Sequence, residues 1–138
     1  MSPVVLDCGP LVAILNRNDQ YHSWCVGQLN DIRGDIITCE AVVTETFFLI
    51  RHVPGAADQL LSLLDHEVVT LEFDLRRNLP AVIVLMRKYR DIPMSLADAC
   101  LVRLSELNGD CRVFTLDSDF TFYRRHGRQA IPLITPVS

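Results

Sequence analysis

The sequence lacks several features that would assign it to a special class of protein. Lysine occurs once among the 13 basic residues, and 17 acidic residues give the 138-residue chain a net charge of −4. This balance disfavours binding to nucleic acid through a broad basic surface, although it permits a local basic patch. The five cysteines contain no Cys-x-x-Cys pair, and most lie in apolar surroundings, so we expect reduced thiols packed in the core.

Long apolar runs and strong compositional bias are also absent. No run approaches the roughly 20 apolar residues of a membrane span, and no basic stretch precedes Asp7, so a signal peptide is not expected. A hydrophobic content of 49%, with six glycines and seven prolines, excludes disorder and collagen. We therefore expect a cytoplasmic protein with no membrane association, and a single domain spanning residues 1–138.

Short apolar segments alternate with helical patterns along the chain. Strands are expected at residues 4–6, 36–38, 68–73, 112–116 and 131–135. Helices are expected at residues 10–16, 21–31, 41–52, 56–65, 75–89 and 95–107. This alternation is typical of the α/β class, in which a parallel sheet is sandwiched by helices and ligands bind beyond the carboxyl ends of the strands.

Two aspartates follow predicted strands directly. Asp7 comes after the first strand and Asp117 after a later one, so a parallel sheet would bring both carboxylates to the same edge, where such folds bind ligands. Each also has a plainer interpretation, because Asp is favoured at helix N-caps and in strand-to-helix turns. The occurrence of both aspartates directly after strands of one expected sheet favours a ligand-binding site.

Glu45 and Asp98 lie within predicted helices. Glu45 shares a helical face with Val42, Phe48 and Leu49, so we expect that face to be buried and the carboxylate to be paired or bound to a cation, or else to reach solvent at the boundary of the core. Asp98 stands three residues after Ser95 in an Asp version of the capping box, a structural role that is compatible with a second, functional one.

Four carboxylates brought together would favour a divalent metal ion. Like charges repel by roughly 4 kcal/mol per close pair at an effective dielectric constant of 20, and a bound cation would relieve this repulsion. Oxygen ligands suit Mg²⁺ or Mn²⁺ better than zinc, and the four histidines show no zinc-ligand spacing. Two such ions can activate a water molecule and stabilise the leaving oxygen of a phosphodiester.

Residues 4–15, 42–47, 96–102 and 114–120 resemble, in order and approximate spacing, the four acidic motifs of the PIN-domain ribonucleases, and most closely the toxins of VapC-type toxin–antitoxin pairs. The resemblance covers essentially the whole chain. It implies a PIN-like fold and a Mg²⁺- or Mn²⁺-dependent endoribonuclease that cuts single-stranded or loop RNA, is held inactive by a cognate antitoxin protein, and forms a homodimer. Cys8 departs from the family, which usually has a small hydroxyl residue there.

The resemblance also implies which side chains form the site. The catalytic, metal-binding carboxylates would be Asp7, Glu45, Asp98 and Asp117, and Asp119 would be an auxiliary metal ligand. Thr115 would give the site polar support and would belong to the substrate-binding residues.

Two further groups of residues allow either a functional or a structural interpretation. Arg124, Arg125 and Arg128 follow the last acidic motif and are predicted to bind RNA phosphates at the rim of the site, although a solvated helix face fits the same pattern. Trp24, Phe47 and Phe48 would form either an apolar groove for the antitoxin or part of the core.

Other functions fit the acidic residues less well. A non-catalytic module that keeps the fold for protein interaction would be expected to have lost one or more of the acids, and none is lost. A haloacid-type phosphatase requires a second Asp where Gly9 stands. A receiver domain requires an acidic pair at the first strand and a late lysine, whereas the only lysine is Lys88.

Overall fold

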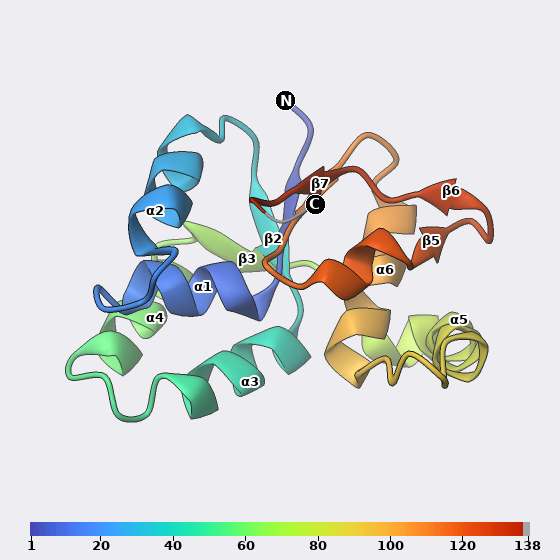
Figure 1. Cartoon of the computed structure of the whole chain (residues 1–138), viewed down its shortest axis with the longest axis horizontal. Helices are drawn as coiled ribbons and strands as arrows, with labels where there is room; N and C mark the ends of the chain where they lie inside the picture. Colours follow the sequence, from blue (N-terminus) through green and yellow to red (C-terminus); the bar gives the residue numbers. More distant parts are fainter. Residues whose placement is uncertain (137–138) are drawn as a thin grey trace.

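A parallel sheet of five short strands lies at the centre of the molecule (Figure 1), in a computed structural model that describes residues 1–136. The strand order is β3-β2-β1-β4-β7, and each neighbouring pair is parallel. The strands are β1 (Val4–Leu6), β2 (Ile36–Thr38), β3 (Val69–Leu71), β4 (Arg112–Phe114) and β7 (Leu133–Ile134). This arrangement confirms the predicted α/β class.

Helices cover both faces of the sheet (Figure 1). In the described part of the chain they are α1 (Cys8–Leu15), α2 (His22–Asp31), α3 (Glu40–Leu49), α4 (Ala56–Asp65), α5 (Leu75–Lys88) and α6 (Leu96–Leu107). Each predicted helix is present, within a few residues of its expected ends. Within residues 1–136, no helix is long and apolar enough to cross a membrane.

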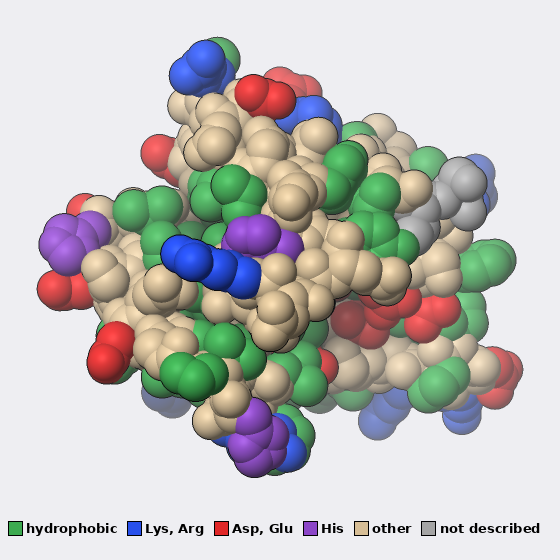
Figure 2. Space-filling view, turned by 60° about the vertical axis from the view of Figure 1, so that its left-hand side comes forward, with side chains coloured by type: hydrophobic (Ala, Val, Ile, Leu, Met, Phe, Trp, Pro, Cys, Tyr) green, Lys and Arg blue, Asp and Glu red, His purple; other side chains and the backbone are tan. Residues whose placement is uncertain are grey.

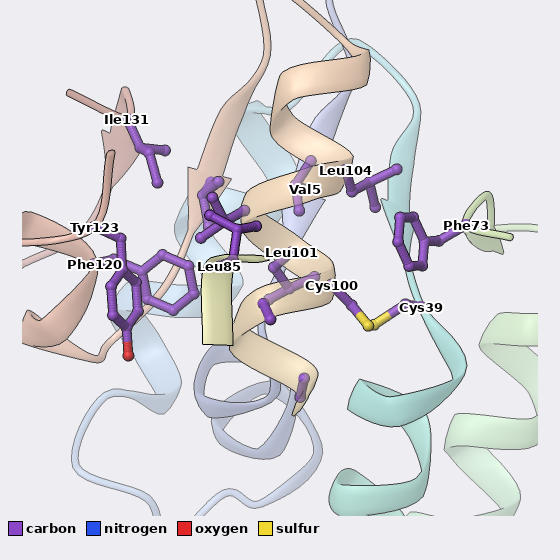
Figure 3. Packing of buried hydrophobic residues seen from close by; sticks show 14 of the residues in the cluster. Val5, Cys39, Phe73, Leu85, Cys100, Leu101, Leu104, Phe120, Tyr123 and Ile131 are labelled. Atoms are coloured by element: carbon purple, nitrogen blue, oxygen red, sulfur yellow. The ribbon is translucent and has the colours of Figure 1, made fainter. Parts of the chain in front are cut away.

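The side chains of the sheet alternate between two hydrophobic cores, as the two-residue period of a strand requires. Val4 and Leu6 of β1 pack with α1, α2 and α4, whereas Val5 packs with α5 and α6. Figure 3 shows the second core, in which Cys100 of α6 meets Cys39 at the start of α3. All five cysteines are free thiols, four of them buried and Cys8 half-buried, as the sequence predicts.

The chain after β4 differs most from the prediction. The strand expected at residues 112–116 ends at Phe114, and it is followed by the 3-10 helix η1 (Ser118–Thr121) and by a hairpin of β5 (Arg124–Arg125) and β6 (Gln129–Ala130). Strands of two residues are too short to show an alternating pattern in the sequence. The helical interpretation of the arginine cluster is therefore wrong.

Candidate active site

Five carboxylate side chains line one cavity of about 420 Å³ at the carboxyl edge of the sheet. Figure 2 shows acidic side chains gathered in a recess on one face of the molecule. Asp7 follows β1, Asp117 follows β4 and Asp119 lies in η1, while α3 supplies Glu45 and the first turn of α6 supplies Asp98. The structure therefore brings together all five of the acids predicted from sequence. Among residues 1–136, no basic side chain lines this cavity.

Asp7 forms the buried floor of the cavity. It is the N-cap of α1, where its Oδ1 accepts a hydrogen bond from the Cys8 N–H at 2.7 Å, and the residue is only 5% exposed. Burial, together with the nearby Asp98 and Asp117, raises the pKa of Asp7 to about 7, although the hydrogen bonds from Thr115 and Cys8 act in the opposite direction. The capping role and the placement in the site thus coexist.

Thr115 lies beneath the acids and does not reach the cavity. Its hydroxyl donates to Asp7 Oδ2 at 2.7 Å and accepts the Asp117 N–H at 2.9 Å, and the residue is fully buried. These two hydrogen bonds fit the predicted polar support, whereas the substrate-binding role does not fit, because a side chain with no exposed surface does not contact RNA. Thr115 instead connects the two loops that carry Asp7 and Asp117.

Close packing holds the same two loops together on their apolar side. A Cβ atom on Gly9 would lie 3.3 Å from Leu116 Cβ, which is closer than most side chains tolerate. Glycine at this position therefore lets the first turn of α1 approach the loop after β4. Asp119 is fixed in the same loop, since its N–H donates to Asp117 Oδ1 at 2.9 Å.

Asp98 is held from two directions. The predicted capping box is present: the Asp98 N–H donates to Ser95 Oγ at 3.0 Å, and the Ser95 N–H donates to Asp98 Oδ2 at 3.4 Å. The hydroxyl of Tyr123 also donates to Asp98 Oδ2, at 3.0 Å. Burial raises the pKa of Asp98, and the hydrogen bond from Tyr123 partly offsets this by favouring the charged form.

Glu45 lies at the exposed rim of the cavity, and the prediction that its helical face is buried is wrong. The buried residues of α3 are Val42, Val43 and Thr46, whereas Glu45, Phe48 and Leu49 face solvent. Apolar residues occur on both faces of α3, so the pattern could not decide which face meets the sheet. Burial, with Asp7 and Glu45 nearby, raises the pKa of the Cys8 thiol, which lines the cavity beside them.

The arginine cluster divides into three different environments. Arg125 is buried, with its guanidinium donating to the carbonyls of Ser105 at 3.3 Å and Gly109 at 2.6 Å, so its predicted RNA contact is wrong. It satisfies carbonyl groups at the carboxyl end of α6. Arg124 is half-buried and bonds the Thr121 carbonyl, while Arg128 is exposed. Only Arg124 and Arg128 stay candidates for RNA contact.

Arg125 should therefore matter for stability. We expect Arg125→Met to lower the free energy of unfolding by about 2 kcal/mol, because the buried Ser105 carbonyl and the partly buried Gly109 carbonyl lose their charged donor. Arg128→Met, on the exposed part of the same hairpin, should change it by less than about 0.5 kcal/mol. Urea denaturation of both variants measures the difference, and equal stabilities would contradict the role assigned to Arg125.

The aromatic residues predicted to form an antitoxin groove also lie in different environments. Trp24 and Phe47 pack against the core beneath α1 and α2, and the Trp24 ring meets Phe114 edge-on at a centroid distance of 5.9 Å. Phe48 is 61% exposed, with the Arg51 guanidinium 3.9 Å from its ring centroid. Trp24 and Phe47, both partly buried, therefore pack against the core as in the core interpretation, and Phe48 is the most exposed of the three.

The donor chemistry of the cavity fits a hard divalent cation, since its charged ligands are all carboxylates. Among residues 1–136, however, no group of three or more Asp, Glu, His or Cys side chains is arranged so that it could hold a metal ion. The carboxylates face one cavity without forming a closed cage, as expected where like charges repel. Holding an ion would require these side chains to move toward one another.

Comparison with known proteins identifies the architecture. No protein-family model matches the sequence, and no curated protein does. The structure is similar to the crystal structure of Mycobacterium tuberculosis VapC20, described as a sarcin–ricin loop cleaving toxin, with a TM-score of 0.75 and 20% sequence identity over 86% of this chain and 93% of that one. The chain has the PIN-like fold of VapC. In this fold all four predicted acidic motifs meet at one edge of the sheet.

Sequence reasoning missed the contribution of Tyr123 to this PIN-like site. The sequence presents Tyr123 only as an aromatic neighbour of the arginine cluster, whereas in the structure it is fully buried. Its contact with Asp98 spans 25 residues of sequence, and no local pattern indicates such a pairing. Ser95, by contrast, could be found from its capping spacing.

Proposed function

We propose that this protein is a metal-dependent endoribonuclease and the toxin of a type II toxin–antitoxin pair. One observation carries the proposal: five carboxylates line a single cavity in a chain with the VapC fold. A non-catalytic PIN-fold module would have no need to keep this costly concentration of negative charge.

The carboxylates would have different roles in metal binding and catalysis, according to how deeply each is buried. Asp7, Asp98 and Asp117, supported by Asp119, would bind Mg²⁺ or Mn²⁺ on the inner side of the cavity. Glu45, at the exposed rim, would bind metal or orient the attacking water for in-line displacement at phosphorus. When bound, the ions would supply charge stabilisation for the phosphodiester and lower the pKa of water.

RNA must approach a cavity that has no basic lining among the described residues, so its phosphates need cations from elsewhere. Arg128 and Arg124 on the β5–β6 hairpin are the proposed contacts, since both retain exposed surface. The substrate class is single-stranded or loop RNA, because its accessible phosphates and unstacked bases can enter an open cavity that a duplex would not fit as well. The sarcin–ricin loop is one substrate to test, since VapC20 is described as a toxin that cleaves it.

The proposed partners are a cognate antitoxin and a second copy of the chain. Exposed apolar side chains on α3, Phe48 at 61% and Leu49 at 46%, support contact with a protein on that face.

Cleavage of RNA by the purified protein tests the proposal. Total cellular RNA is incubated with the protein and Mg²⁺ or Mn²⁺, and parallel reactions contain EDTA or the Asp98→Asn variant. We expect discrete fragments that require the metal and vanish in the variant. Absence of cleavage with every metal, from a folded protein, would favour the non-catalytic interaction module instead.

A further inference from the structure

We infer that Tyr123 is a positioning residue for Asp98, holding this carboxylate where it can bind the metal ion of the proposed nuclease. The inference rests on the proposed function and adds a residue outside the four acidic motifs. Its basis is the hydrogen bond from the Tyr123 hydroxyl to Asp98 Oδ2 at 3.0 Å, together with the packing that fixes the tyrosine ring.

The ring of Tyr123 has almost no freedom to move. The residue is fully buried, and it packs edge-on against Phe120, at a centroid distance of 5.1 Å, and against Tyr89, at 5.2 Å. Figure 3 shows Phe120 and Tyr123 side by side, with the tyrosine hydroxyl at the outer end of the ring. A donor held in this way can direct a flexible carboxylate.

The backbone at Tyr123 is also anchored. The Tyr123 N–H bonds the Asp119 carbonyl at 3.2 Å. Tyr123 thus joins the turn that carries Asp119 to the helix that carries Asp98.

The bond leaves one carboxylate oxygen of Asp98 less constrained. Tyr123 and the Ser95 N–H both donate to Oδ2, so these bonds orient the carboxylate and neither of them occupies Oδ1. Without the tyrosine hydroxyl, the carboxylate would keep only its contacts with Ser95, of which the bond from the N–H is long at 3.4 Å. Repulsion from the other carboxylates would then turn Asp98 away.

The chain provides a matched control. Tyr89 belongs to the same aromatic cluster, but its hydroxyl accepts the Arg124 N–H and does not line the acidic cavity. Tyr123→Phe and Tyr89→Phe each remove one hydroxyl and keep the ring, so a merely structural role predicts similar effects for the two variants.

Mn²⁺ binding to the 138-residue protein tests the inference. Free Mn²⁺ is measured by electron paramagnetic resonance during titration of wild type, Tyr123→Phe and Tyr89→Phe, with Asp98→Asn as the reference. We expect Tyr123→Phe to weaken Mn²⁺ binding by about 10- to 100-fold, the range for groups that orient metal ligands. Tyr89→Phe should bind Mn²⁺ like wild type, and the melting temperatures of both Phe variants should be similar.

A double variant distinguishes an effect that acts through Asp98 from a general loss of structure. Tyr123→Phe added to Asp98→Asn should weaken Mn²⁺ binding no further, because its effect acts through Asp98. Wild-type Mn²⁺ affinity in Tyr123→Phe, or equal losses in both Phe variants, would overturn the inference while leaving the nuclease proposal intact. A wild-type protein that neither binds Mn²⁺ nor cleaves RNA would overturn both.

Discussion

Replacing Asp7 with Asn should lower metal-dependent RNA cleavage by more than about 100-fold while leaving the fold intact. Even groups that only orient metal ligands are worth about 10- to 100-fold, so loss of a proposed ligand should exceed that range. Asn keeps the shape of the side chain and an acceptor for the Cys8 N–H, so α1 retains its cap. Initial rates of cleavage at saturating Mn²⁺ measure the loss.

The control for this variant is Asp58→Asn. Asp58 is an exposed residue in the first turn of α4 and does not line the acidic cavity, so its replacement removes one negative charge elsewhere. Cleavage by this control should match wild type. Comparable cleavage by Asp7→Asn and wild type would show that Asp7 serves the structure alone.

The stability of the metal-free protein should fall as the pH rises from about 4 to about 7. The pKa of Asp7 is raised from 3.8 to about 7 in the folded state, so in this range the folded protein binds a proton that the unfolded chain has lost. The contribution is fully present below pH 3.8 and is lost as the pH rises through 7. At 1.36 kcal/mol per pH unit, Asp7 accounts for a loss of about 4 kcal/mol. The raised pKa of Asp98 acts with the same sign.

Urea denaturation in EDTA at several pH values, for wild type and Asp7→Asn, measures this effect. Asn imitates the protonated acid at every pH, so the variant should resemble wild type near the acid end of this range and exceed its stability at the neutral end. Parallel profiles for the two proteins would contradict a raised pKa at Asp7. The same variant would gain stability while losing cleavage, which is typical of a carboxylate kept for function.

The regular elements and the order of the acids follow from local sequence. Apolar runs too short for helices, each ended by Asp, Gly or a polar cluster, indicate β1, β2 and β4, and the helical periods indicate all six helices of the described chain. Parallel strands end at one edge of a sheet, so the positions of Asp7 and Asp117 directly after two strands are enough to predict that they lie together. The Ser95–Asp98 capping box needs only its three-residue spacing.

The orientation of individual side chains does not follow in this way. The sequence pattern places Glu45 on a buried face because α3 has apolar residues on two sides, and only contact with the sheet selects Val42 and Thr46 as the inner ones. Arg125 fits a surface cation by its sequence neighbours, but α6 ends beside it, and the carbonyls of Ser105 and Gly109 accept hydrogen bonds from its guanidinium.

The sequence by itself therefore determined the fold class and the helices, through periodicity, and the set of acidic residues, through their positions along the chain and the resemblance of their motifs to those of the PIN-domain ribonucleases. Only the tertiary structure decided which acids are buried, that the polar support expected of Thr115 goes to Asp7, and that Tyr123 bonds Asp98. Those pairs are 108 and 25 residues apart. Contacts over such separations arise from packing of the whole chain, and no local pattern encodes them.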